Sequence, residues 1–285
     1  MKRLKHVLTA MLMLWLAAGC KDAASSQQQQ QEDARQHLET LIQPYLNQMQ
    51  QIEHVIYSDT VLGREAEWEL AKEYKQLADE MGNILKEQAR ENIGNEMGFL
   101  LVTQYLDPID DAKLLDALIP QMPDDIRQRE EVAAIEQQLE AGKAIEVGRI
   151  MADIVMNTPE GEPLSVMEEV KKNKLTIIHF WASWCGACRN EMALLRQLYA
   201  EHQPEGLGMV GISIDESAAD WNRAIGELKL AWPQISDLKG WECDAARRFQ
   251  TRSLPFIIVV DSKGRIVQKG LPAEELKQFI GRQLL

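Results

Sequence analysis

The sequence predicts an α/β domain, a central mixed sheet with helices on both faces, preceded by an all-α N-terminal module. Two observations lead to this prediction. From residue 143 onward, short apolar runs alternate with segments of helical periodicity, an order that places helices over a sheet. Between Glu32 and Gly142, apolar residues recur only at helical spacing. We therefore expect four segments, with bounds 1–19, 20–31, 32–142 and 143–285.

Residues 1–19 have the pattern of a secretory signal peptide. Lys2, Arg3 and Lys5 precede an apolar stretch from Val7 to Ala18 that is too short to span a membrane. The run Leu-Ala-Ala-Gly-Cys that ends at Cys20 resembles a bacterial lipobox. That resemblance implies that Cys20 becomes the lipidated first residue of the mature chain, anchored in a membrane. Ordinary secretion, with cleavage after small residues, is the alternative.

Residues 20–31 are expected to form a tether. The stretch is rich in serine and glutamine, with five consecutive glutamines, and it has almost no apolar side chain to bury. A flexible coil of this length would hold the folded part close to the membrane. The alternative is that this stretch is the frayed start of the next helix.

Residues 32–142 are predicted to form an acidic module of four or five helices. Pro44 should kink or delay the first helix, and Pro108 should end another. Two further prolines bracket a break, after which Asp124 could cap a helix from Ile126 to Ala141. The apolar residues at helical spacing in its first two helices are Leu38, Leu41, Ile42, Tyr45, Leu46, Met49, Leu70, Tyr74, Leu77, Met81, Ile84 and Leu85.

Charge separates the two halves. The segment from Glu32 to Gly142 carries 24 acidic and 9 basic side chains, a net of −15, whereas Lys143 to Leu285 carries 19 and 18. A chain of this charge does not attract nucleic acid, which we exclude as a partner. The acidic helices either dock a basic partner or are simply solvated surface.

The second half should begin with a strand-turn-strand unit at Ala152–Met156 and Pro163–Val166. Predicted strands follow at Leu175–Trp181, Gly208–Ile214, Phe256–Asp261 and Arg265–Lys269. Predicted helices lie at Gly186–His202, Ser217–Leu228, Asp244–Gln250 and Ala273–Leu284.

Two cysteines lie where the first long strand meets the next helix. If Cys185 is in the first helical turn, unpaired backbone N–H groups and the positive end of the helix dipole favour its thiolate, the form that attacks disulfides. Cys188, three residues later, shares that helix face and can reach it. We therefore expect Cys185 to be the nucleophile, Cys188 the resolving thiol, and the two together a redox-active disulfide.

The stretch from Phe180 to Met192 resembles the thioredoxin superfamily, and its Arg-x-Glu-Met continuation is similar to the envelope-facing TlpA/ResA branch. The likeness extends from Val147 to Leu285, where Gly211–Asp215 looks like the next strand and loop and Ser253–Phe256 like the cis-proline loop. It implies a thioredoxin-like fold, a cis Pro255, and a protein-disulfide reductase recharged by a membrane electron donor.

The chain departs from that family at Ala187, Ala193 and Leu254, and Ala193 stands where many relatives kink the helix with proline. Ala187 replaces the usual proline between the cysteines, which leaves the reduction potential open. Leu254 precedes Pro255 where a β-branched residue is commoner, which leaves the substrate preference open. Leu254 would offer backbone N–H and C=O groups to an extended substrate. The helical module is similar to the helical part of the N-terminal extensions of Bacteroidetes TlpA-like lipoproteins.

Other interpretations of the cysteine pair are weaker. A zinc site needs a second pair of ligands, and no second Cys-x-x-Cys or spaced histidine pair exists, so no metal is expected. Attachment of a c-type haem needs histidine directly after Cys188, where Arg189 stands. An inert structural disulfide remains possible. There is no phosphate-binding glycine loop, so no nucleotide or other cofactor is expected.

Four further residues deserve a prediction. Alignment with thioredoxins places His179 beneath the second cysteine, where it could accept the Cys188 proton, or else simply bond to backbone. Trp181 should be core, and Trp184 should be exposed beside the nucleophile as a shield or docking surface. Glu191 should be a surface residue that faces arginine neighbours.

Cys243 is left unpaired. The default expectation is burial as a small apolar group at the start of a helix. The alternative is a second redox centre or an intermolecular bridge.

The residues together predict a thiol-disulfide oxidoreductase, lipid-anchored in the bacterial cell envelope and facing the periplasm. Protein disulfides are its expected substrates, and it is expected to reduce them. A disulfide-forming oxidase or isomerase is the enzymatic alternative. A partner-binding redox sensor that uses the helical module is the alternative from another class.

Overall fold

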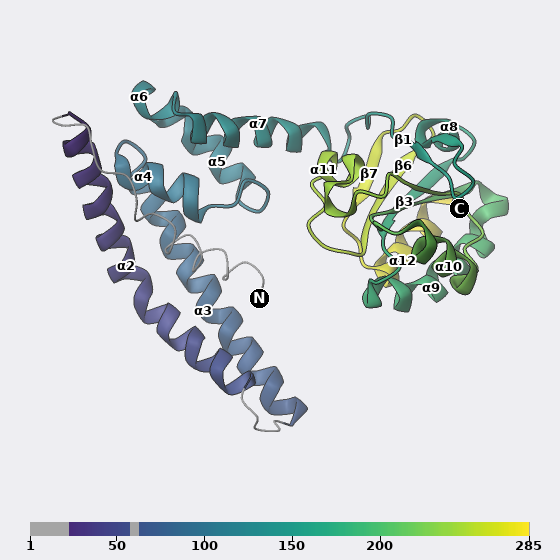
Figure 1. Cartoon of the computed structure of the whole chain (residues 1–285), viewed down its shortest axis with the longest axis horizontal. Helices are drawn as coiled ribbons and strands as arrows, with labels where there is room; N and C mark the ends of the chain where they lie inside the picture. The colour runs from purple at the N-terminus through teal and green to yellow at the C-terminus, as the bar shows by residue number, and fades with distance from the viewer. Residues whose placement is uncertain (1–22, 58–62, 285) are drawn as a thin grey trace. The chain divides into compact units, whose positions relative to one another are not determined.

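The structure, a computed structural model, describes residues 23–57 and 63–284 (Figure 1). The chain forms two compact units, divided between Leu139 and Glu140 within helix α7 (Glu130–Ala144). The predicted signal peptide and Cys20 lie outside the described residues. In the part of the chain that is described, no helix has both the length and the apolar character needed to cross a membrane.

The first unit is built on two long helices, α2 (Ala23–Ile56) and α3 (Arg64–Glu91), which lie side by side (Figure 1). Leu38 and Ile42 of α2 and Met81 and Leu85 of α3 are buried, each pair four residues apart. This spacing places them on one helix face, as the sequence predicts.

Shorter elements complete the core of this unit. Asn95 caps α4, since its side-chain oxygen accepts from the backbone N–H groups of Met97 and Gly98. Every residue of α4 is buried, and α4 contacts both long helices. These short elements are α4 (Glu96–Leu100), the π-helix η1 (Leu101–Tyr105), α5 (Ala112–Leu118), the 3-10 helix η2 (Ile119–Gln121) and α6 (Asp124–Arg127), followed by α7. The described residues thus form six α-helices here, rather than four or five.

The flexible coil predicted for the tether is wrong for residues 23–31, which the structure describes as helical. Helix α2 begins at Ala23, so residues 23–31 are the start of the helix, which was the alternative interpretation. Glutamine is a good helix former, and the Gln31 amide donates to Glu96 Oε2 over 2.9 Å. Pro44 does not delay the helix either, because α2 continues through it. Buried residues on both sides, such as Ile42 and Met49, offset the lost hydrogen bond.

The predicted helix break is present, but Asp124 does not cap the helix as expected. Pro123 precedes α6, whose first residue is Asp124, and the longer α7 begins only at Glu130. The end of a helix before Pro108 is confirmed, since η1 stops at Tyr105. Proline is tolerated in the first turn of a helix, but it disfavours the α conformation of the residue before it. A helix therefore tends to end before each proline, which separates these short helices.

The second unit contains a seven-stranded sheet in the order β2-β1-β5-β4-β3-β6-β7. The interior strand β3 pairs in parallel with β4 and antiparallel with β6, so the sheet is mixed. The strands are β1 (Val155–Asn157), β2 (Pro163–Ser165), β3 (Leu175–Trp181), β4 (Leu207–Ser213), β5 (Gln234–Ser236), β6 (Phe256–Asp261) and β7 (Ile266–Lys269).

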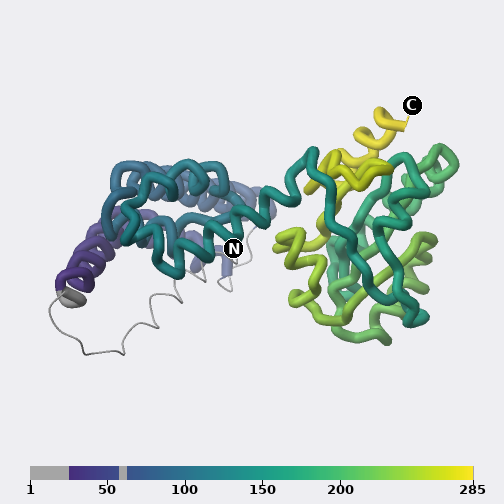
Figure 2. Tube along the Cα trace, turned by 90° about the horizontal axis from the view of Figure 1, so that it is seen from above, coloured from purple at the N-terminus to yellow at the C-terminus, as the bar shows by residue number. Residues whose placement is uncertain are grey.

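Helices flank this sheet on both faces, and the last of them, α12, lies on the outside of the unit, in yellow in Figure 2. Helices α9 and α12 pack against each other, and α8 contacts β3 and β4. The helices are α8 (Val166–Val170), α9 (Gly186–His202), α10 (Ala218–Leu228), α11 (Asp244–Arg248) and α12 (Ala273–Leu284), with 3-10 turns η3 (Gln203–Glu205) and η4 (Gly240–Glu242). The expected thioredoxin-like arrangement is confirmed.

Two elements of this unit were not predicted. Strand β5 has only three residues, of which Gln234 and Ser236 are polar yet buried, so it lacks the apolar signal of a strand. The start of helix α8 has the sequence pattern Ser-x-x-Glu, formed by Ser165 and Glu168. Ser165 Oγ accepts a hydrogen bond from the Glu168 N–H over 3.1 Å. This Ser-x-x-Glu spacing is a capping signal that predicts the start of a helix.

Candidate active site

The cysteine pair lies at the junction of β3 and α9. Cys185 is the N-cap of α9, and its sulfur accepts from the Cys188 backbone N–H over 3.1 Å. Cys185 and Cys188 form a disulfide, with their Cα atoms 5.3 Å apart. Once reduced, a Cys185 thiolate at this position is stabilised by the unpaired N–H groups and the dipole of a 17-residue helix.

The two sulfurs differ in access. Cys188 is fully buried, whereas Cys185 keeps 7 % of its surface exposed. A protein partner can therefore approach the pair from the Cys185 side. This asymmetry suits Cys185 to attack an incoming disulfide and Cys188 to act only within the protein.

Asp215 holds the loop that leads to the cysteines. Its carboxylate, 1 % exposed, accepts from the Ser183 backbone N–H (3.0 Å), the Ser183 hydroxyl (2.6 Å) and the Ser213 hydroxyl (2.7 Å). Three donors satisfy a buried charge that would otherwise be costly. The sequence marked Asp215 only as the end of a strand and loop, and its link to Ser183 was not foreseen.

His179 lies in the middle of β3, fully buried, and its Nε2 is 2.9 Å from Glu191 Oε1. The prediction that Glu191 faces surface arginines is wrong, since its side chain is only 15 % exposed and points to His179. Glu191 comes three residues after Cys188 on α9, on the same helix face. Because Cys188 faces the core, this spacing was a signal that Glu191 faces inward too.

The other ring nitrogen of His179 has no partner among the described residues. With the proton on Nε2, donated to the Glu191 carboxylate, Nδ1 keeps a free lone pair in the core. The hydrogen-bond partner of His179 is thus a carboxylate, and not the backbone group that was the alternative prediction.

The Leu254–Pro255 peptide bond is cis, as the resemblance implied. Strands β3 and β6 are antiparallel, with Phe180 opposite Phe256, so the loop before β6 lies beside the end of β3. That end leads directly to the cysteines. Leu254 and Pro255 are both half-buried, and no backbone hydrogen bond joins Leu254 to another described residue.

The two tryptophans behave as expected. Trp181 is buried, and its Nε1 donates to Gln234 Oε1 over 3.0 Å, which ties β3 to the short polar strand β5. Trp184, directly before Cys185, is 59 % exposed. Its ring lies 6.4 Å from that of Trp241, measured between centroids.

Cys243 is free and fully buried, next to the start of α11, which was the default expectation. Burial raises the pKa of this thiol to about 11. A thiol so protonated and enclosed is a poor nucleophile.

Comparison with known proteins agrees with this geometry. Residues 147–269 match the AhpC/TSA family. Sporulation thiol-disulfide oxidoreductase A of Bacillus subtilis is 28 % identical over 138 residues, which covers 46 % of this chain and 79 % of the relative. Thiol-disulfide oxidoreductase ResA of Bacillus thuringiensis is 22 % identical over 140 residues, 49 % of this chain and 78 % of the relative.

Among solved structures, the thioredoxin domain of a thiol-disulfide oxidoreductase from Bacteroides vulgatus is 28 % identical and covers 50 % of this chain and 99 % of that domain, with a TM-score of 0.46. The sheet order, the cysteine pair at the start of α9 and the named relatives all point to one class of protein. The second unit is a thioredoxin-like domain of the AhpC/TSA family, and the chain belongs to the thiol-disulfide oxidoreductases.

Proposed function

We propose that the protein is a membrane-anchored reductase of protein disulfides in the bacterial cell envelope, with Cys185 as nucleophile and Cys188 as resolving thiol. The observation that supports this most is the difference in exposure between the two cysteines at the start of α9. Cys185 caps the helix and is partly exposed, whereas Cys188 is fully buried. A structural disulfide has no need of such a difference.

The reaction proceeds in two exchanges. The Cys185 thiolate attacks one sulfur of the substrate disulfide, the substrate S–S bond breaks, and the leaving thiolate takes up a proton. A mixed disulfide now joins Cys185 to the substrate. The Cys188 thiol loses its proton and attacks the Cys185 sulfur, which releases the second substrate thiol and closes the Cys185–Cys188 bridge. The substrate gains two electrons and two protons, and a dithiol donor at the membrane later returns them to the enzyme.

His179 is the proposed acceptor of the Cys188 proton. Its Nδ1 lone pair is free of any described partner, and Glu191 holds the opposite nitrogen. A carboxylate on Nε2 stabilises the imidazolium that proton uptake creates. In this scheme Glu191 acts through His179 and is a positioning residue.

Leu254 and Pro255 are proposed to receive the substrate chain. Their loop lies beside the end of β3, and the backbone groups of Leu254 are available to an extended segment. Pairing through backbone groups is tolerant of substrate sequence, as in other cases of strand addition.

The envelope location rests on the first twenty residues, which have the signal and lipobox pattern. Growth of cells with radiolabelled palmitate tests it: the wild-type chain should incorporate the label and sediment with membranes. A Cys20→Ser chain should do neither. Label in the Cys20→Ser chain, or a wild-type chain that is fully soluble, contradicts the anchor.

Insulin reduction with dithiothreitol as electron source tests the activity. The wild type should accelerate precipitation of the insulin B chain, and Cys185→Ser should fall to the rate of dithiothreitol alone. Cys188→Ser should still attack but accumulate a mixed disulfide, visible as a mass increase that dithiothreitol removes. Absence of wild-type turnover together with a stable partner complex would favour the redox-sensor alternative.

The direction of electron flow is decided by potential. Thioredoxin lies near about −270 mV and the oxidant DsbA near about −120 mV. A reductase requires the Cys185/Cys188 couple to equilibrate with glutathione close to the former value. A couple close to the latter would identify an oxidase instead.

A further inference from the structure

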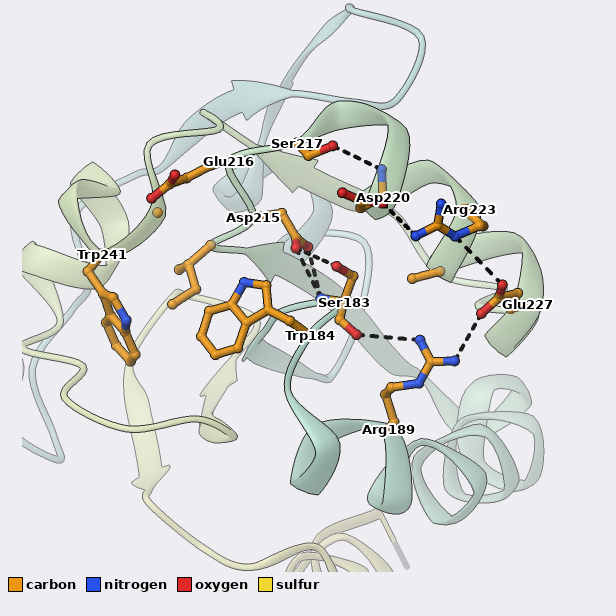
Figure 3. Close-up of a pocket in the computed structure, with 13 residues that line it drawn as sticks. Ser183, Trp184, Arg189, Asp215, Glu216, Ser217, Asp220, Arg223, Glu227 and Trp241 are labelled. Atoms are coloured by element: carbon orange, nitrogen blue, oxygen red, sulfur yellow. Dashed lines mark hydrogen bonds and ion pairs between the residues drawn. The ribbon is translucent and has the colours of Figure 1, made fainter. Parts of the chain in front are cut away.

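A cavity of about 620 Å³ opens directly beside the cysteine loop (Figure 3). Trp184, the residue before Cys185, forms part of its wall, and Trp241 of the turn η4 forms another part. Both indoles are large and exposed, at 59 % and 43 %. Two exposed tryptophans whose ring centroids are 6.4 Å apart beside a nucleophile form an apolar surface that a soluble domain rarely leaves uncovered.

The cavity wall is charged unevenly. It includes two arginines, Arg189 and Arg223, and both are engaged, Arg189 with Glu227 over 2.9 Å and Arg223 with Asp220 and Glu227. In Figure 3 these ion pairs lie on one side of Asp215, and the two indoles lie on the other side. Among the described residues that line the cavity, none on the tryptophan side is a cation.

Glu216 is the charge on that side. Its carboxylate has no ion pair or hydrogen bond with any of the described residues. Its carboxylate lies close to Gly240, where a Cβ would clash with Glu216 Oε1, and Gly240 has φ +58. The buried Asp215 adds a second negative charge that three neutral donors satisfy but no cation neutralises.

We propose that Trp184, Trp241 and Glu216, here called the tryptophan subsite, bind the arginine or lysine side chain of a substrate polypeptide close to the disulfide that Cys185 attacks. This inference rests on the proposed reductase function. The aromatic faces attract a cation through their negative quadrupole, and the unpaired Glu216 supplies the counter-charge. An uncharged apolar side chain would contact the rings but leave Glu216 without a counter-charge.

The site is close enough to select substrates. Trp184 is adjacent to Cys185, and an extended chain rises about 3.3 Å per residue. The recognised cation therefore lies within roughly three residues of the attacked cysteine. The enzyme then reduces disulfides in basic surroundings faster than others.

The experiment uses the full chain, reduced, and short peptides that each carry one cysteine as a mixed disulfide with a chromogenic thiol. One peptide series has arginine at each of the three positions on either side of the cysteine, and the matched series has citrulline, its neutral isostere. The rate of chromophore release measures attack by Cys185. For the best position we expect the wild type to prefer arginine to citrulline by about tenfold.

Variants locate the effect. Glu216→Gln and Trp241→Ala should each reduce the arginine/citrulline ratio to about 3 or less. Glu242→Gln is the matched control, because it removes the same charge from the residue after Trp241 but from outside the cavity lining. Its ratio should equal that of the wild type.

A wild-type ratio near 1 at every position overturns the subsite while leaving the reductase function intact. An equal loss in Glu242→Gln also overturns it, because the preference would then come from general charge. A faster reaction with norleucine than with arginine would make the site apolar and sink the proposal. If no peptide reacts, the proposed function fails, and this inference fails with it.

Discussion

The imidazole of His179, on strand β3, contacts the carboxylate of Glu191, on the helix that begins at the cysteines, with 2.9 Å between Nε2 and Oε1. The side chain of His179 is fully enclosed, and that of Glu191 is 15 % exposed. In the proposed mechanism, the free nitrogen of this buried histidine accepts the proton that Cys188 loses. Its helix partner is one turn from Cys188, the thiol that must lose one.

Removal of this pair should slow resolution of the mixed disulfide more than its formation. For His179→Ala we expect the rate at which Cys188 releases a bound peptide to fall about a hundredfold near neutral pH, the usual size of general base catalysis. The deficit should shrink toward about pH 9, where the thiol ionises unaided. Glu191→Gln keeps the hydrogen bond without the charge and should give an intermediate loss.

Stopped-flow measurement of the second exchange, between about pH 6 and 9, separates this role from a structural one. Glu201→Gln, an exposed acid on the same helix, is the control. An unchanged resolution rate in His179→Ala across that range would end the assignment.

Asp215→Asn should destabilise the second unit. The amide nitrogen of asparagine would face the N–H and hydroxyl groups that now donate to the carboxylate, so at least one buried donor loses its acceptor. We expect a loss of about 1–3 kcal/mol in unfolding free energy. Urea unfolding at constant m-value measures it.

Glu216→Gln serves as the neighbouring control for that loss. Glu216 has no described partner, so its substitution should change stability by less than about 0.5 kcal/mol. Equal midpoints for Asp215→Asn and Glu216→Gln would show that the Asp215 network is not stabilising.

The helical unit contains a buried ion pair, Glu96–Arg129, whose contribution to stability should depend on pH. Arg129 donates to both carboxylate oxygens of Glu96 (2.6 and 2.8 Å), lies over the Phe99 ring, and both charged side chains are largely buried. The hydrogen bonds from Arg129 lower the pKa of Glu96. A lowered carboxyl pKa contributes stability above the ordinary glutamate range, and this contribution is lost as the pH falls through the lowered value.

Arg129→Ala should therefore destabilise the helical unit by about 3 kcal/mol near neutral pH, because it leaves a buried carboxylate unpaired. The difference from wild type should shrink as Glu96 becomes protonated in acid. Hydrogen exchange of the α4 amides in the full chain reports both effects. Arg127→Ala, which breaks the more exposed pair with Glu136, should cost only about 0–1 kcal/mol. If the stability difference between wild type and Arg129→Ala is independent of pH, the proposed role of the Glu96–Arg129 pair is wrong.

Cys243 should resist alkylation. With a pKa of about 11, roughly a thousandth of this thiol is ionised at about pH 8, and burial blocks the reagent as well. After reduction, brief iodoacetamide treatment of the folded chain should label Cys185 first and leave Cys243 unmodified, as peptide mass spectrometry shows. Urea should make Cys243 reactive. Rapid labelling of the folded protein, or a bridge from Cys243 to another cysteine, would refute its inert role.

The sequence predicts the catalytic domain well because its signals are local. The buried strand Leu175–Trp181 is a largely apolar run, and a helix begins soon after it at Gly186, and these bounds agree with the structure. Contacts between distant segments are different. Asp215 and Ser183 are 32 residues apart, and only the pairing of β3 with β4 brings them together. Polar residues that satisfy each other inside a fold look, in sequence, like surface residues.

The sequence predicts correctly that the first unit is helical, but it predicts the ends of the individual helices less well. Proline and glutamine have general tendencies that packing overrides, as α2 demonstrates by running from Ala23 through Pro44. The elements between Asn95 and Glu130 are short, and their ends depend on tertiary contacts such as the Glu96–Arg129 pair. Periodicity cannot locate such ends.

In the proposed reductase cycle, the enclosure of Cys188 implies that the electron donor opens the bridge at Cys185, the same atom that later attacks the substrate. The electron donor and the disulfide substrate therefore compete for access to Cys185 and cannot both react with it at the same time. Steady-state kinetics should be of the ping-pong type, with each partner acting as a competitive inhibitor of the other when it is in large excess.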